Sequence, residues 1–188
     1  VDNKLVFPDE FIPSLEKVED MNILDRHVIG KALCLMQANP MLKRLAINLS
    51  DQAFNDDRLY GYIEEKLTRY NIDPSMIVFE ITESASLSNI TGTQRMINRL
   101  SELGCHFSID DFGTGFSTFA YLKQIPAGSV KIDGSFVKDM LKDPIDLVLV
   151  KAINETAHAL NKSTVAEFVE DGETLEKLAE MGVNFAQG

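Results

Sequence analysis

The chain has 188 residues, of which 45% are hydrophobic and 25% charged, the usual balance of a globular domain. Its formal net charge of -11 argues against DNA or RNA as a partner, because a polyanion is usually held by clustered Lys and Arg. A substrate that carries phosphate would need metal ions, or a few well-placed cations, to offset the protein's own field. No run of about 18 apolar residues is present, so no segment of this sequence predicts a membrane span.

The two cysteines, Cys34 and Cys105, both lie in apolar segments, which favours buried free thiols over a disulfide. Free thiols fit a reducing compartment, and no signal peptide is visible. We therefore expect a cytoplasmic domain, with any membrane anchor of the parent protein in regions outside this chain. We also expect the domain to be truncated at both ends of the sequence.

Short apolar runs alternate with longer amphipathic segments along the chain. The apolar runs predict strands at Arg44–Leu49, Met76–Thr82, His106–Asp110, Ser129–Ile132, Ser163–Phe168 and Val183–Gln187. The helical period between them predicts helices at Ile23–Ala38, Asp57–Tyr70, Thr91–Leu103, Phe116–Leu122, Ile145–Leu160 and Gly172–Met181. No repeat, low-complexity stretch or linker divides the sequence, so we expect residues 1–188 to form a single domain.

Strands that alternate with helices predict βαβ units and a parallel sheet. Two architectures compete, the doubly wound open sheet and the TIM-like (β/α) barrel. No Gly-rich phosphate loop follows a strand as a dinucleotide fold requires, so the α/β barrel is favoured. A full barrel typically has eight strands. Because this sequence predicts fewer, we expect an incomplete barrel, with an N-terminal strand and the last strand missing.

A polar residue lies at or near the carboxyl end of each predicted strand, bracketed by or following apolar neighbours. These polar residues are Asn48, Glu80, Asp110 followed by Asp111, Lys131, Glu167 and Gln187. Side chains alternate between the faces of a strand, so this set points into the barrel if its apolar neighbours face the helices. Barrel active sites are built at the carboxyl ends of the strands. One such residue is more often a turn former or helix cap, but capping does not explain six successive strands.

Five of these side chains form an oxygen-only donor set: Asn48, Glu80, Asp110, Asp111 and Glu167. Such donors suit Mg²⁺ or Mn²⁺, and the lack of His or Cys among them argues against zinc. So many carboxylates at one mouth would repel each other without cations. We expect two divalent ions about 3.5–4 Å apart, an arrangement used in phosphate ester hydrolysis. Lys131 is then the fixed cation, beside the nucleophilic water or the phosphate.

Seven segments, in chain order, resemble motifs of the EAL domain family. They are Phe7–Pro13 (P-x-E-F-I-P), Ile47–Ser50 (V/I-N-L-S), Phe79–Glu83 (E-x-T-E), Asp110–Gly115 (D-D-F-G-T/S-G), Lys131–Val137 (K-I-D-x-S-F-V), Ala166–Glu170 (A-E-x-V-E) and Ala186–Gly188 (A-Q-G). Each motif is weak alone, but seven in order along nearly the whole chain are highly specific. The triplet that names the family, whose Glu is a metal ligand, should lie shortly before Phe7 and is absent from this sequence.

The resemblance implies a metal-dependent phosphodiesterase that hydrolyses one phosphodiester of cyclic di-GMP, giving linear pGpG. It implies that Asn48, Glu80 and Asp110 bind a first metal ion, and that Asp110 and Asp111 serve a second. In the same way, it implies that Lys131 contacts the catalytic water.

The resemblance implies further roles outside this metal set. Glu167 would assist at the second metal or position the water, and Gln187 would help to hold the dinucleotide. Glu83 and Glu170 would be supporting residues, with Glu83 fixing the loop Phe112–Thr118. The family also implies a homodimer, and a fusion to a sensory or diguanylate cyclase domain in the parent protein.

Three other functions compete with this one. A catalytically inactive EAL domain acting as a cyclic di-GMP receptor is disfavoured. Such a domain is expected to lack metal ligands or the catalytic lysine, and every one of these residues that falls within this sequence is present. A barrel aldolase with Lys131 as its Schiff-base lysine is disfavoured because nearby acids raise the pKa of that amine. A structural or dimerising module would leave the carboxylates solvated and empty.

Overall fold

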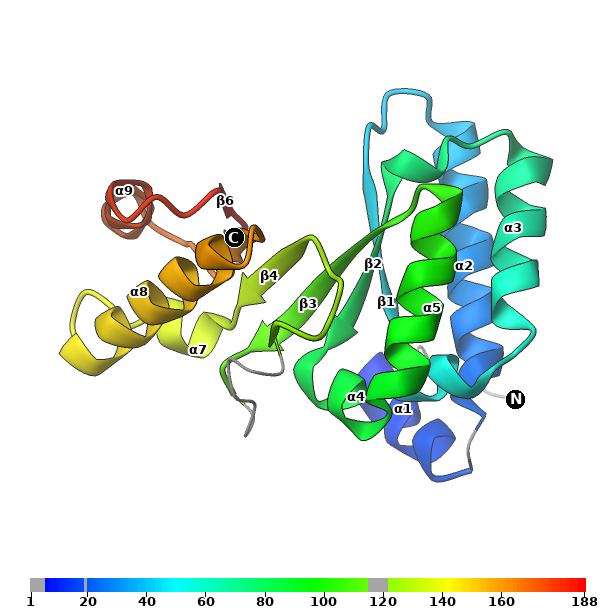
Figure 1. Cartoon of the computed structure of the whole chain (residues 1–188), viewed down its shortest axis with the longest axis horizontal. Helices are drawn as coiled ribbons and strands as arrows, with labels where there is room; N and C mark the ends of the chain where they lie inside the picture. Colours follow the sequence, from blue (N-terminus) through cyan, green and yellow to red (C-terminus); the bar gives the residue numbers. More distant parts are fainter. Residues whose placement is uncertain (1–5, 19, 115–121) are drawn as a thin grey trace.

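The computed structural model describes residues 6–18, 20–114 and 122–188 (Figure 1). Its strands are β1 (Leu45–Leu49), β2 (Ile77–Thr82), β3 (His106–Phe112), β4 (Ser129–Ile132), β5 (Ser163–Ala166) and β6 (Phe185–Ala186). Its helices are α1 (Pro8–Lys17), α2 (Met21–Ala38), α3 (Leu59–Tyr70), α4 (Glu83–Ser88), α5 (Ile90–Leu103), α7 (Gly134–Val137), α8 (Pro144–Ala159) and α9 (Gly172–Glu180), with 3-10 turns η1 (Asp51–Asn55) and η2 (Pro74–Met76).

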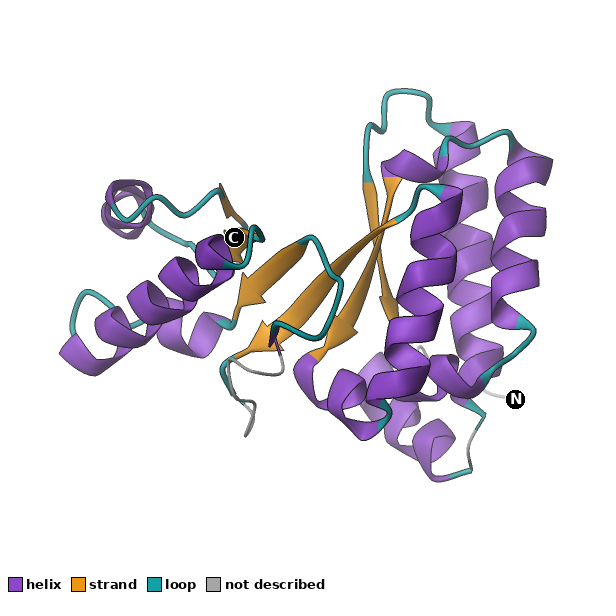
Figure 2. Ribbon diagram, in the orientation of Figure 1, coloured by secondary structure: helices purple, strands orange, loops and turns teal. Residues whose placement is uncertain are grey.

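The six strands form one parallel sheet in the order β1-β2-β3-β4-β5-β6. Figure 2 shows α2, α3 and α5 beside strands β1 to β3, and α8 beyond β4. A doubly wound sheet would reverse its strand order at a switch point, whereas a barrel keeps chain order. The fold is therefore a TIM-like barrel that is incomplete in the described residues, where β1 and β6 are edge strands, as predicted.

The two faces of the sheet differ in burial. In β2, Phe79 and Ile81 are fully buried, whereas their neighbours Val78 and Glu80 are only half-buried. The buried face belongs to the core shared with helices such as α2 and α5, and there the ring of Phe79 lies 5.6 Å from that of Phe107. The polar residues at the strand ends therefore lie on the opposite, concave face of the sheet.

Local capping explains where several helices begin and end. Asp143 accepts a hydrogen bond from the backbone of Ile145 at the start of α8, with Pro144 in the first turn. Asp171 caps α9 in the same way through Thr174. Gly104, at φ 108°, ends α5 in the left-handed conformation that glycine adopts without steric cost.

Three helices were not predicted, α1, α4 and α7. Helix α1 was missed because it contains Pro13, and proline inside a segment usually indicates that no helix continues there. Helices α4 and α7 were missed because they are too short to show a helical period. Strand β5 ends at Ala166 rather than at Phe168, because Phe168 turns to φ 53°. The predicted helix Phe116–Leu122 lies outside the described residues except for Leu122.

The cysteines partly depart from expectation. Both thiols are free, and Cys105 is buried as predicted, but Cys34 is exposed on α2. The prediction of burial for Cys34 was wrong because the apolar stripe of α2 that faces the core runs through Ile29, Leu33 and Met36. Within the described residues, no helix is both long and apolar enough to cross a bilayer.

Candidate active site

Lys131, near the carboxyl end of β4, is the centre of the candidate site. It is 5% exposed, and its Nζ lies 2.7 Å from Glu167 Oε1, 2.8 Å from Asp110 Oδ1 and 3.4 Å from Glu80 Oε2. An ammonium group has three N–H donors, so each of these carboxylates can accept one. Carboxylates that reach the mouth from β2, β3 and the residue after β5 therefore converge on one buried cation.

A β-bulge brings a further carboxylate to this point. Ile109 pairs with Val130, but the next pair is Phe112 with Ile132, so β3 has one residue more than β4 over this stretch. Asp111 lies within this bulge, and its backbone has a positive φ of 53°. Bulges re-aim side chains next to active sites. Consecutive strand residues normally point to opposite faces, yet carboxylate oxygens of Asp110, Asp111 and Glu167 all lie within 4.8 Å of one another.

The electrostatics of the site reflect an excess of carboxylates over cations. Burial raises the pKa of Glu80 above its ordinary value, and the charge of Asp110 adds to this increase, while Lys131 opposes it. Burial likewise raises the pKa of Asp111, with Asp110, Asp133 and Glu167 adding to the effect. Burial alone would lower the pKa of Lys131, but its hydrogen bonds with Asp110 and Glu167 raise it. The site is thus a place where added positive charge is favourable.

The chemistry of this donor set fits a hard divalent cation. Asp110, Asp111 and Glu167 supply carboxylate oxygens near one point, and Glu80 joins them through Lys131. Asn48 stands opposite Glu80 in the register of β1 and β2, so its amide lies on the same concave face. Oxygen donors of this kind are the ligands that Mg²⁺ and Mn²⁺ prefer.

The concave face continues from Lys131 towards both edges of the sheet. A hollow of about 390 Å³ lies against it, lined by residues that include Glu80, Ser108, Lys131 and Gln187. Gln187 follows β6, and its backbone N–H donates to the Ala166 carbonyl at 2.8 Å. Gln187 and Lys131 thus line the same hollow.

Glu170 lies apart from this cluster. It is exposed in the segment after β5. Among the described residues, it is not one of the carboxylates that meet Lys131.

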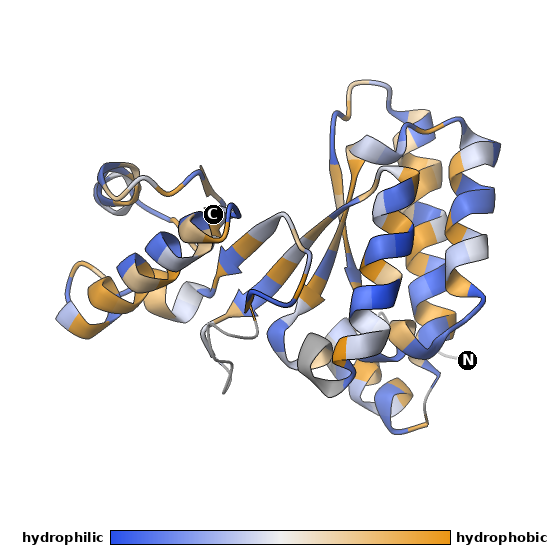
Figure 3. Cartoon of the chain, in the orientation of Figure 1, coloured by the Kyte–Doolittle hydropathy of each residue, from blue (hydrophilic) through white to orange (hydrophobic). Residues whose placement is uncertain are grey.

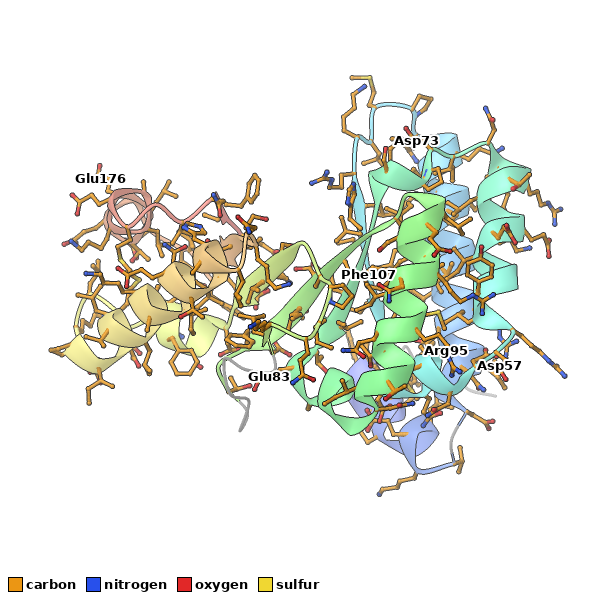
Figure 4. The ribbon with its side chains drawn as sticks, in the orientation of Figure 1. Asp57, Asp73, Glu83, Arg95, Phe107 and Glu176 are labelled. Atoms are coloured by element: carbon orange, nitrogen blue, oxygen red, sulfur yellow. The ribbon has the colours of Figure 1, made fainter. Side chains whose placement is uncertain are left out.

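Glu83, at the start of α4, supports the segment that follows the bulge. Its carboxylate is buried, and Oε2 accepts a hydrogen bond from the Gly113 N–H at 2.7 Å. Figure 4 shows Glu83 beside the end of β3. Gly113 has φ 110°, and a Cβ there would lie 2.8 Å from the Phe136 ring. Of the loop Phe112–Thr118, residues 115–118 lie outside the described residues.

Two residues of this region were not identified from the sequence. Ser108, two positions before Asp110 on the same face, is buried, and its hydroxyl has no hydrogen-bond partner among the described residues. The alternation of β3 could have indicated it. Phe168, directly after Glu167, is the other, and no local pattern predicted its positive φ.

Comparison with known proteins agrees with this geometry. The profile of the family described as EAL domain matches residues 2–188. The chain is 35% identical over 188 residues to the cyclic di-GMP phosphodiesterase PdeB of Shewanella oneidensis, and 34% identical over 189 residues to PdeF of Escherichia coli. These alignments cover 98% and 99% of this chain, but only 22% and 25% of the two relatives' own lengths.

Solved structures give the same result. A PaMucR phosphodiesterase in complex with c-di-GMP matches with a TM-score of 0.90 and 32% identity, over 100% of this chain and 77% of that one. The FimX EAL domain from Pseudomonas aeruginosa, bound to c-di-GMP, matches with a TM-score of 0.90 and 27% identity, over 98% of this chain and 75% of that one. The chain belongs to the EAL domain family.

Proposed function

We propose that this chain is a catalytic domain that hydrolyses cyclic di-GMP to linear pGpG, with two divalent metal ions, Mg²⁺ or Mn²⁺. The observation that carries the proposal is the buried Lys131 ammonium held among Glu80, Asp110 and Glu167 at the barrel mouth. Relatives named as cyclic di-GMP phosphodiesterases share about a third of its sequence, which supports the same substrate.

The proposed metal ligands are Asn48, Glu80, Asp110 and Asp111. When bound, divalent cations lower the pKa of water and neutralise charge on the phosphate. In the reaction, a water oxygen bonds to phosphorus as the bond from phosphorus to the ribose 3′ oxygen breaks, which leaves a 5′-phosphate and a 3′-hydroxyl. The proton from water ends on the leaving oxygen.

The other proposed roles belong to side chains around this group. Lys131 donates a hydrogen bond to the attacking water or to a phosphate oxygen, where its charge has the most effect in a water-poor site. Glu167 orients the same water as a hydrogen-bond acceptor, and Gln187 holds the dinucleotide. Glu83 fixes Gly113 and so the bulge, and Glu170 supports the segment after β5.

The test is turnover by the full-length protein with cyclic di-GMP and Mg²⁺ or Mn²⁺, with pGpG followed by chromatography. Glu80→Ala and Lys131→Ala are compared with Lys43→Ala, an exposed lysine in the loop before β1. Metal-dependent turnover that disappears in the first two variants and persists in the third is the expected result. Tight binding without turnover would make the domain a cyclic di-GMP receptor, and neither binding nor turnover would overturn the proposal.

We propose that the domain forms a homodimer through α8. Ile145, Val148 and Leu149 lie three and four residues apart on α8 and are exposed, Ile145 at 68% and Val148 at 64%, and exposed Leu141 lies in the turn before the helix. Figure 3 shows the hydrophobic colour along this part of α8. An apolar patch of this kind marks an interaction surface. Ile145→Glu should give a monomer in light-scattering chromatography, whereas Met41→Glu, at an exposed apolar residue elsewhere, should not.

The setting of the domain is also a proposal. Because the chain spans about a quarter of the relatives' lengths, we place it in a longer protein, fused to a sensory or diguanylate cyclase domain. We place it in the cytoplasm, where free thiols such as Cys34 and Cys105 persist. Fractionation of cells with an antibody against the domain tests the location.

A further inference from the structure

Asp25 is a carboxylate at a core position of α2. The buried residues of this helix recur every three or four positions and are Met21, Asp25, Ile29, Leu33 and Met36. Asp25 is 4% exposed, and it is not one of the carboxylates that meet Lys131. A carboxylate buried in an apolar stripe costs free energy unless hydrogen bonds compensate for the lost water. The partners of Asp25 therefore indicate why the helix carries a charge at this position.

Both carboxylate oxygens of Asp25 accept hydrogen bonds from a single residue, Ser50. Oδ1 accepts from the Ser50 backbone N–H at 3.1 Å, and Oδ2 accepts from the Ser50 hydroxyl at 2.6 Å. Ser50 precedes the 3-10 turn η1, yet its side chain makes no capping hydrogen bond to that turn. A serine at such a position usually accepts from a backbone N–H of the turn that follows. The hydroxyl of Ser50 is instead bonded to α2.

This contact lies at the carboxyl end of β1, beside a proposed metal ligand. Leu49 is the last residue of β1 and the last to pair with β2, so Ser50 is the first residue beyond the ladder. Asn48 is one position earlier in the ladder, opposite Glu80, and its side chain is exposed. Asp25 thus holds the backbone just where the sheet stops holding it. Ligands must be held within about 0.5 Å of their working geometry, so the place of this strand end matters.

We propose that Asp25 is a positioning residue, which acts through Ser50 to keep the amide of Asn48 in place for a divalent cation. This inference rests on the proposed function, because it needs the metal ion that Asn48 and Glu80 are proposed to bind. Residues that orient metal ligands without touching the metal usually contribute about 10- to 100-fold to its affinity. Asp25 contacts neither water nor substrate at the site. Its loss should therefore weaken metal binding and leave kcat at saturating metal unchanged.

The experiment titrates Mn²⁺ into the full-length protein and follows the electron paramagnetic resonance signal of the free ion. Asp25→Ala removes both hydrogen bonds to Ser50, and Ser50→Ala removes the one made by the hydroxyl. Asp25→Asn can keep both, because its amide oxygen accepts the N–H and its amide nitrogen donates to the hydroxyl oxygen. We expect the dissociation constant of one Mn²⁺ ion to rise about 10- to 100-fold in Asp25→Ala. The rise should be smaller in Ser50→Ala and absent in Asp25→Asn.

Asp56→Ala is the matched control, at a second buried aspartate in the segment that follows β1. Asp56 accepts a hydrogen bond from the Arg58 backbone N–H at 3.0 Å and lies 3.2 Å from Arg26 Nη2, and neither contact involves Ser50. Asp25→Ala and Asp56→Ala should both lower the thermal midpoint in EDTA, because each removes a buried group with bonded partners. Only Asp25→Ala should weaken Mn²⁺ binding.

The outcomes separate positioning from stability and from the proposed function. A lower midpoint with wild-type Mn²⁺ affinity in Asp25→Ala would make Asp25 a structural residue and overturn the inference alone. Equal losses of affinity in Asp25→Asn and Asp25→Ala would assign the effect to charge, which also overturns it. If Asp25→Ala does not fold, wild-type affinity in folded Ser50→Ala overturns it instead. A wild-type protein that binds no Mn²⁺ would overturn the proposed metal site and this inference with it.

Discussion

Two buried lysines, one at each end of the barrel, show how position decides what the same residue does. Lys131, 5% exposed, lies at the carboxyl ends of the strands among Glu80, Asp110 and Glu167. Lys162, 8% exposed, lies at the opposite end, just before β5, and its Nζ donates to the carbonyls of Ile125 at 2.8 Å and Ala127 at 2.6 Å.

The surroundings of the two lysines shift their pKa values in opposite directions. Hydrogen bonds with Asp110 and Glu167 outweigh burial and raise the pKa of Lys131. Lys162 has dipolar carbonyls as its hydrogen-bond partners, and burial lowers its pKa. In barrels, the carboxyl end carries chemistry and the amino end carries stability. The charge environment of each lysine follows this division.

The largest expected effect is at the mouth. Lys131→Met leaves three carboxylates without their shared cation, and removing one partner of a buried pair costs about 3–5 kcal/mol of unfolding free energy. We expect this loss in urea unfolding with EDTA. Because a bound cation can replace the missing ammonium charge, we expect saturating Mg²⁺ to stabilise the variant more than it stabilises the wild type. Equal stability of variant and wild type in EDTA would mean that the carboxylates are solvated and independent of Lys131.

The next effect, at the opposite end, should be smaller and independent of metal. Lys162→Met leaves the buried carbonyls of Ile125 and Ala127 without their donor, which should cost about 1–3 kcal/mol of unfolding free energy. Turnover per folded molecule should stay at the wild-type value, because the proposed active site is at the other end. Loss of kcat in this variant at full folding would contradict the division between the two ends.

The pH dependence of stability should also separate the wild type from Lys162→Met. Below the pKa of Lys162 in the folded chain, both the folded and the unfolded chains hold the proton. The cost of burying the charged amine then lowers the free energy of unfolding by its full amount. Between that pKa and the unfolded value of 10.5, the folded chain has lost the proton and the unfolded chain keeps it, so stability rises with pH. Urea unfolding of both proteins from pH 7 to 10.5 should show the wild type gaining stability relative to the variant.

The smallest expected effect concerns the cysteines and leaves stability unchanged. Burial raises the pKa of Cys105 to about 12, so almost no thiolate forms near pH 8. Iodoacetamide should label exposed Cys34 in the native protein and reach Cys105 only after unfolding, as mass spectrometry can show. Native labelling of both thiols would place Cys105 in a region that opens readily.

Much of the fold could be predicted because it depends on local patterns. The β4 prediction, Ser129–Ile132, has the observed bounds, and the period-2 alternation of Val78 to Ile81 placed Glu80 on the concave face. Short helices such as α7 and the exposure of Cys34 could not be predicted, since they depend on what packs against each segment. The domain limits and the proposed roles of the site residues stay predictions.

The sequence by itself determined the parallel barrel, the family and the polar residues at the strand ends, because periodicity and motifs are properties of the chain. Only the tertiary structure decided that Lys131 bridges carboxylates from neighbouring strands, since those distances depend on register and twist. It also decided that the bulge turns Asp111 towards Asp110 and that Phe168 rests on Gly134 at a positive φ. Both features arise where strands end, and there the backbone follows long-range contacts rather than local preference.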